Sequence, residues 1–154
     1  MDYVQNGLIQ NQSILFHGIS RSGKTCTAIA IGIFARVVYG KEIHIVSEEK
    51  LFRELRNIYG ARKREENSSM TEQKLIESLK KYPHLFLDDF GLEPDSKAYN
   101  RSIAEIIRAR HYDKRATIFT TNLSPDDIKI IYTDKLLGRI YEMTNDDQYY
   151  LKMQ

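Results

Sequence analysis

The 154-residue chain has 23 lysines and arginines against 21 aspartates and glutamates, and 42% of its residues are hydrophobic. This composition is typical of a soluble globular protein, and the length fits one domain over residues 1–154. No apolar run approaches the ~20 residues of a membrane-spanning helix, and the N-terminus lacks the pattern of a signal peptide. One cysteine cannot form an internal disulfide. We therefore expect a reducing, cytoplasmic setting without membrane contact.

Short apolar runs alternate with longer helical patterns, which favours an α/β fold with a parallel sheet. Strands are expected at 13–16, 42–46, 84–88, 116–120 and near 148–153. Helices are expected at 24–38, 48–59, 71–80, 97–112, 125–131 and 134–141. Residues 60–69, GARKREENSS, combine glycine with charged and small polar residues and predict an exposed loop. Asp126 and Asp127 favour the start of the short helix, because negative charge there complements the helix dipole.

The stretch from Gly18 to Thr25, GISRSGKT, lies between an apolar run and a helical pattern. It matches the phosphate-loop pattern G-x-x-x-x-G-K-[ST], in which backbone N–H groups and the positive helix end cradle an anion. Lys24 would then reach the β- and γ-phosphates of ATP, and the Thr25 hydroxyl would bind Mg²⁺. The predicted nucleotide-binding residues are Gly18, Ser20, Arg21, Ser22, Gly23, Lys24, Thr25 and Cys26. The alternative is a strand-to-helix turn that matches by chance.

Arg21 occupies a position that the minimal pattern leaves free. A residue there must adopt a backbone conformation that an L-residue tolerates. Its guanidinium could approach a phosphate, a neighbouring subunit or DNA and so alter nucleotide affinity, or it could be solvated and without a role. Cys26, just inside the expected helix, is interpreted as a small packed residue rather than a nucleophile.

The run from His84 to Asp89, HLFLDD, is an apolar strand that ends in two carboxylates. Charges at the end of a buried strand need a cation or a partner to offset their desolvation. Asp88 would hold Mg²⁺ as the Walker B carboxylate, and Asp89 could polarise the attacking water as general base. The alternative is a pair of turn or helix-capping aspartates before Gly91.

A third polar strand end follows the run TIFTT at residues 117–121. Asn122 could orient the lytic water or contact the γ-phosphate, since its amide offers both a donor and an acceptor. The alternative is a turn over residues 122–125 that simply ends the strand.

These three elements, followed by LLGRIYEM at residues 136–143, resemble the AAA+ ATPases of the DnaC/DnaI helicase-loader group and the related IstB-type transposition helpers. The resemblance implies a P-loop NTPase of AAA+ type with a five-stranded parallel sheet in the order 5-1-4-3-2. It also implies that Asn122 is the sensor 1 residue and that Arg139 is an arginine finger completing a neighbouring subunit's active site. A solvated Arg139 is the alternative. At the position of Arg21 the family usually has glycine.

The same resemblance implies a Mg²⁺-dependent ATPase acting in DNA replication, with ATP and Mg²⁺ as cofactors. Its partners would be a replicative helicase or sister subunits, with single-stranded DNA as a further candidate. A transposition helper and a non-catalytic, nucleotide-gated adaptor stay open as alternatives. Helicase loaders usually add an N-terminal domain, and many AAA+ proteins add a C-terminal lid. We expect this chain to be a core without either.

A basic stretch with one aromatic residue could face single-stranded DNA. It comprises Arg53, Arg56, Tyr59, Arg62, Lys63 and Arg64. Because glutamates are interleaved with these residues, a solvated helix and loop is the favoured interpretation.

Overall fold

The computed structural model describes residues 3–8, 10–63, 71–91, 97–145 and 148–154. Its strands form one parallel sheet in the order β2-β3-β4-β1-β5. They are β1 (Ile14–Gly18), β2 (Ile43–Ser47), β3 (His84–Asp88), β4 (Ala116–Thr121) and β5 (Tyr150–Met153). This is the predicted order 5-1-4-3-2 read from the opposite edge. The predicted fold is therefore confirmed, with β4 between the phosphate-loop strand and the strand of the paired aspartates.

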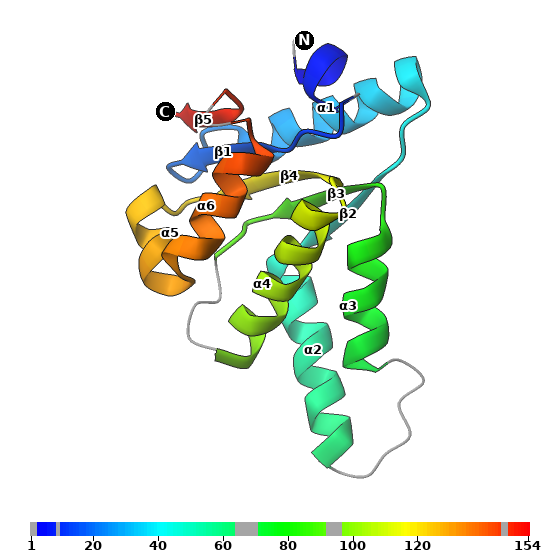
Figure 1. Cartoon of the computed structure of the whole chain (residues 1–154), viewed down its shortest axis with the longest axis vertical. Helices are drawn as coiled ribbons and strands as arrows, with labels where there is room; N and C mark the ends of the chain where they lie inside the picture. Colours follow the sequence, from blue (N-terminus) through cyan, green and yellow to red (C-terminus); the bar gives the residue numbers. More distant parts are fainter. Residues whose placement is uncertain (1–2, 9, 64–70, 92–96, 146–147) are drawn as a thin grey trace.

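Helices cover both faces of the sheet and give the molecule three layers (Figure 1). The helices are α1 (Lys24–Tyr39), α2 (Glu48–Lys63), α3 (Glu72–Lys81), α4 (Lys97–Tyr112), α5 (Pro125–Ile131) and α6 (Asp134–Met143). Helix α1 lies on one side with the π-helical segment η1 (Tyr3–Leu8), while α2, α3, α4 and α6 lie on the other. No helix among the described residues is both long and apolar enough to cross a membrane.

The core consists of two hydrophobic clusters, because successive side chains of a strand point to opposite faces of the sheet. Leu85 and Leu87 of β3 belong to the larger cluster, with Ile103 and Ile106 of α4. Phe86 lies between these two leucines in sequence but belongs to the smaller cluster under α1. Strand β3 is thus buried on both faces, which fixes the carboxylates at its end relative to the sheet.

The prediction of a loop over residues 60–69 was wrong at its start, because α2 continues to Lys63. Alanine, arginine and lysine are good helix formers, and basic side chains near a helix C-terminus complement its dipole. These preferences outweigh the single glycine at position 60. Residues 64–70 of the predicted loop lie outside the described residues.

The start of α5 is capped as its acidic first turn suggested. The Ser124 hydroxyl accepts a hydrogen bond from the Asp127 amide, and the Asp127 carboxylate accepts one from the Ser124 amide. This reciprocal arrangement satisfies two donors that a helix otherwise leaves open, and Pro125 occupies the first helical turn. The capping box therefore fixes where α5 begins, with three residues between it and the end of β4.

Arg110 of α4 is fully buried and connects three elements. Its guanidinium donates hydrogen bonds to the carbonyl oxygens of Leu79 and Tyr82, at 2.9 and 2.7 Å, and to that of Ala116. Its Nε atom donates to the Thr117 hydroxyl at 2.8 Å. Burial lowers the pKa of Arg110 to about 10, so the side chain stays charged at neutral pH. Arg110 therefore holds the C-terminal end of α3 against the start of β4.

Candidate functional site

Apart from Arg139 on α6, the predicted site residues lie at or directly after the carboxyl ends of three neighbouring strands. The phosphate loop follows β1, Asp88 ends β3, and Asn122 follows β4, which pairs with both of these strands. In an open parallel sheet this edge is where ligands bind. The topology therefore brings the loop, the paired aspartates and the end of β4 to one edge of the sheet.

Two glycines of the loop are required by its geometry. Gly18 has a φ of 146°, and a Cβ atom there would lie 1.9 Å from the carbonyl oxygen of Met153 in β5. Gly23 has a φ of 90° and caps the N-terminus of α1 in the left-handed conformation, which glycine adopts without strain. Both positions thus depend on the absence of a side chain.

Arg21 also has a left-handed backbone, with a φ of 65°. The expectation that an L-residue would find a tolerated conformation is met, although this region is sparsely populated for non-glycine residues. Its side chain is exposed. Cys26 is exposed as well, so the interpretation of a packed cysteine was wrong. Cys26 lies in the first turn of α1, on the outer side of the helix, and belongs to neither hydrophobic cluster.

Lys24 is only 5% exposed, because its ammonium group bends back over the loop. The Nζ atom donates hydrogen bonds to the carbonyl oxygens of Gly18 and Ile19, at 3.0 and 2.7 Å. These bonds hold a positive charge against the backbone of the loop. An anion bound to the loop would meet both the backbone N–H groups and this charge.

A hydrogen bond joins the phosphate loop to β3. The Thr25 hydroxyl donates to Oδ1 of Asp88 at 2.9 Å, across 63 positions of sequence. Hydroxyl and carboxylate oxygens are the ligand types that Mg²⁺ prefers, and the ion commonly keeps several waters. The two side chains assigned to the metal are therefore in direct contact and form an all-oxygen donor set that fits Mg²⁺.

The end of β4 holds the turn that follows β3. Thr120 donates from its hydroxyl to Oδ1 of Asp88 at 2.6 Å and accepts a hydrogen bond from the Asp89 amide at 2.9 Å. Its carbonyl oxygen accepts from the Phe90 amide at 2.7 Å, and the Thr121 hydroxyl donates to the Phe90 carbonyl. Neither threonine belongs to a motif that predicts a site residue. The available signal was the polar Thr-Thr pair at the end of an apolar strand.

Asp89 has a left-handed backbone, with a φ of 56°, inside this turn. Burial raises the pKa of its carboxyl group above the ordinary value, the neighbouring Asp88 raises it further, and Lys24 opposes the shift. A raised pKa moves a carboxylate toward the range in which it exchanges protons efficiently near neutral pH.

Side chains that follow α5 and begin α2 support the same turn. Phe90 stacks on Tyr132, with ring centroids 4.9 Å apart, and the Tyr132 hydroxyl lies 3.1 Å from a carboxylate oxygen of Glu48. Glu48, at the start of α2, is fully buried. In sequence it is one of the glutamates interleaved with the basic stretch. Its missed signal was its position directly after an apolar strand.

Four further predicted residues make fewer contacts with the rest of the site. Asn122 follows β4 but has an exposed side chain. Arg139, on α6, donates to the carbonyl oxygen of Lys135 in its own helix at 3.4 Å. Ser22 lies 3.5 Å from the Lys24 ammonium, whereas Ser20 is exposed. The structure thus brings together Lys24, Thr25, Asp88 and Asp89. The other four residues lie outside this group and make few contacts of their own.

The predicted basic stretch lies on α2 and beyond its end. Arg53 and Arg56 are exposed. Arg62 and Lys63 belong to the last turn of α2, and Arg64 lies outside the described residues.

Known proteins with similar sequences and structures can be compared with this geometry. The IstB-like ATP binding protein family matches residues 2–140. The replicative helicase loader DnaC of Buchnera aphidicola subsp. Baizongia pistaciae is 26% identical over 139 residues, which cover 90% of this chain and 54% of that protein. DnaC of Escherichia coli strain K12 is 23% identical over 128 residues, which cover 83% of this chain and 49% of that protein. The chain therefore spans about half the length of these curated relatives.

Solved structures of replication proteins share the fold. A crystal structure of the DnaC helicase loader superposes with a TM-score of 0.81 at 23% identity, covering 99% of this chain and 84% of that chain. The replication initiator DnaA bound to AMPPCP and single-stranded DNA superposes with a TM-score of 0.75 at 14% identity. The superposition covers 99% of this chain and 43% of the DnaA chain. These likenesses show the AAA+ fold. Together with the family match over most of its length, they show that the chain belongs to the IstB-like ATP binding protein family.

Proposed function

We propose that this protein binds ATP with Mg²⁺ and hydrolyses it as a helicase-loader-like AAA+ factor in DNA replication. The observation that carries the proposal is the hydrogen bond from Thr25 to Asp88, which unites the phosphate loop with the end of β3. An accidental strand-to-helix turn would not require a carboxylate from a distant strand at this position. The chain's membership of an ATP binding family supports the same assignment.

The roles of the innermost residues follow from their positions. Backbone amides of the loop and the N-terminus of α1 would hold the phosphates, and Lys24 would exchange its carbonyl contacts for phosphate oxygens. Thr25 and Asp88 would hold Mg²⁺, directly or through water. When bound, the ion supplies positive charge that offsets the charge of the phosphates.

Asp89 is proposed as the general base. It would take a proton from the attacking water while the oxygen of that water bonds to the γ-phosphorus and the bond to ADP breaks. Its raised pKa and its place beside Asp88 support this role. Asn122, exposed at the end of the neighbouring strand, would orient the water with its amide.

Arg139 is proposed to act on the active site of a neighbouring subunit. The buried face of α6 is formed by Leu136, Leu137, Ile140 and Met143. The guanidinium of Arg139 bonds only weakly to its own helix, so little is lost when it turns to a partner. An arginine supplied in this way neutralises charge on the transferring phosphoryl group, and it makes turnover depend on assembly.

The partners follow from the named relatives rather than from the geometry. Two curated relatives are replicative helicase loaders, which favours a replicative helicase over a transposase as partner. A solved DnaA structure contains single-stranded DNA, which makes this the nucleic acid to test first. A role in replication would place the protein in the cytoplasm.

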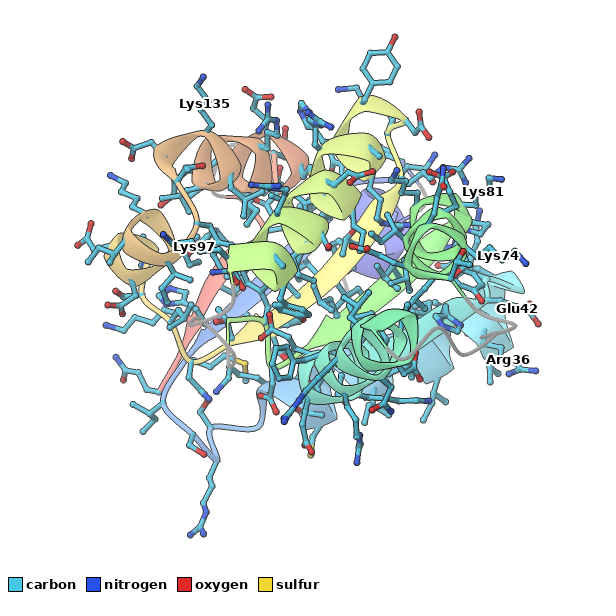
Figure 2. All side chains as sticks on the ribbon, turned by 90° about the horizontal axis from the view of Figure 1, so that it is seen from below. Arg36, Glu42, Lys74, Lys81, Lys97 and Lys135 are labelled. Atoms are coloured by element: carbon cyan, nitrogen blue, oxygen red, sulfur yellow. The ribbon has the colours of Figure 1, made fainter. Side chains whose placement is uncertain are left out.

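The proposal is tested by measuring steady-state ATP hydrolysis against protein concentration, with and without single-stranded DNA, with Lys24→Ala as the blank. We expect a specific rate that rises with concentration or DNA and is lost in Arg139→Ala. Lys135→Ala is the matched control, because Lys135 points outward from the same helix (Figure 2) and its backbone contact with Arg139 stays.

Two other outcomes would change the assignment. Tight ATP binding with a rate no higher than that of Lys24→Ala would indicate a nucleotide-gated adaptor. No ATP binding by the wild-type protein would overturn the proposed function altogether.

A further inference from the structure

Thr120 occupies a central position among the residues of the proposed ATPase centre. It lies one residue before the end of β4, opposite Phe16 of β1, and its side chain is fully buried. The same hydroxyl group contacts both residues of the aspartate pair, at 2.6 Å from Asp88 Oδ1 and 2.9 Å from the Asp89 amide nitrogen. No other described side chain bonds to both.

The direction of each hydrogen bond is fixed by chemistry. The backbone N–H of Asp89 can only donate, so the Thr120 oxygen accepts there and its own proton points to Asp88. The Thr25 hydroxyl donates to the same oxygen, Oδ1. The second carboxylate oxygen, Oδ2, accepts no hydrogen bond from the described part of the chain. The two threonines thus fix one rotamer of Asp88 and leave Oδ2 available.

The contact with Asp89 acts on its backbone rather than on its side chain. Asp89 has a left-handed φ of 56°, which an aspartate does not adopt by preference. The bonds from the Asp89 and Phe90 amides to Thr120 compensate for this strain by pairing both donors with the end of β4. The direction in which the Asp89 side chain leaves the turn therefore depends on Thr120.

We propose that Thr120 is a positioning residue, whose hydroxyl sets the orientation of the metal-binding carboxylate and of the proposed base together. The proposal rests on the proposed function of the site. It explains why a hydroxyl group is needed: only a group that both donates and accepts can bridge an amide and a carboxylate. Its β-branch restricts the rotamer, which keeps the hydroxyl aimed at Asp88.

The test compares Thr120→Val, Thr120→Ser and Thr117→Val. Valine preserves the shape of threonine and removes the hydroxyl, whereas serine retains the hydroxyl. Thr117 is also buried on β4, and its hydroxyl serves Arg110 rather than the site. Thr117→Val therefore controls for the stability cost of losing a buried hydroxyl from this strand.

The first measurement is the affinity for a fluorescent ATP analogue with Mg²⁺ and with EDTA. In Thr120→Val we expect the tightening by Mg²⁺ to weaken about tenfold, as the loss of a charge-assisted hydrogen bond predicts, while the affinity in EDTA stays within about twofold. Thr120→Ser and Thr117→Val should both retain the tightening. Equal Mg²⁺ dependence in wild type and Thr120→Val would overturn the proposal.

The second measurement is the hydrogen exchange of the Asp89 amide in the protein without nucleotide. This amide should exchange at least about tenfold faster in Thr120→Val than in Thr120→Ser or Thr117→Val, because its acceptor is lost. Unchanged exchange would show that Thr120 does not hold the turn. If the wild-type protein binds no nucleotide while the exchange result holds, the proposed function fails and the structural link to Asp89 stands.

Discussion

Two residues of the site, Arg21 and Asp89, hold left-handed backbones without being glycine. Each such conformation costs on the order of 1 kcal/mol, and such strain persists where the surrounding structure over-determines it. At Asp89 the end of β4 supplies the compensating hydrogen bonds. At Arg21 the side chain is exposed. A glycine at position 21 would adopt this conformation without strain.

The charge of Asp89 should reduce the stability of the fold at neutral pH. Its pKa is raised by burial and then by Asp88, so the folded chain keeps this proton to higher pH than the unfolded chain does. Stability then falls as the pH rises from the ordinary value of 3.8 through the raised one. Asp89→Asn should raise the Tm at pH 7.5, and the gain should shrink as the pH approaches 4. Asparagine tolerates a left-handed backbone, so the comparison isolates the charge.

Thermal unfolding of both proteins over this pH range is the measurement. Asp126→Asn is the control, because it removes an exposed carboxylate that favours the start of α5 and should therefore not raise the Tm. A lower Tm of Asp89→Asn than of wild type at pH 7.5 would contradict the assigned effect of burial.

Asp89→Asn should also bind ATP and turn it over about a hundredfold more slowly, as expected when a general base is lost.

The residue-scale chemistry was predictable where a short motif carries it. The spacing around Lys24 and Thr25 predicted the loop, and the run HLFLDD predicted β3 with its aspartates. Thr120 was not predictable in this way, because its partner lies 32 positions away and becomes a neighbour only when β3 pairs with β4. The functions of Asn122 and Arg139 stay predictions.

At the scale of elements, Arg110 connects α4, the end of α3 and β4. Arg110→Met should lower the free energy of unfolding by roughly 3 kcal/mol, because it leaves several buried carbonyl oxygens without a donor. Urea unfolding measures the loss. Arg108→Met, at an exposed position of the same helix, should change stability by less than about 0.5 kcal/mol. Similar losses in both variants would contradict the role of Arg110 as a connector.

Elements with strong local signals were predicted closely, whereas those stabilised from a distance were not. Strand β3 and helices α4 and α5 have the expected bounds. The segment η1 was not predicted, since Tyr3 is buried against Tyr149, with ring centroids 5.1 Å apart, near the other end of the chain. Helix α2 extends past its predicted end because the helix preference of several residues outweighed one glycine.

At the scale of the whole molecule, three histidines make the fold sensitive to acid. Burial is the first cause that lowers the pKa of His17, His44 and His84. The unfolded chain therefore binds these protons more readily, and stability is lost as the pH falls below the ordinary value of 6.5 toward the lowered ones. We expect the urea midpoint to fall between pH 7.5 and pH 5.5.

The urea midpoints are best compared in the Asp89→Asn variant. In the wild-type protein, protonation of Asp89 stabilises the fold as the pH falls and so opposes the effect of the histidines. His84→Gln should remove part of the slope, because His84 is the most buried of the three histidines. A midpoint that stays constant or rises toward pH 5.5 would show that these imidazoles do not determine the acid response.

The order of strands also has a consequence for how the protein is made. Strand β1, which carries the phosphate loop, takes both neighbours from later parts of the chain, pairing Ile14 with Ile118 and Leu15 with Tyr150. A ribosome must therefore make the chain through β4 before this strand gains its first neighbour, and through β5 before it gains the second. Such distant pairings close slowly, and the growing chain must keep its first apolar strand from aggregating meanwhile. Nucleotide could thus stabilise the folded domain, but it cannot help to form the site before β3, β4 and β5 have been made.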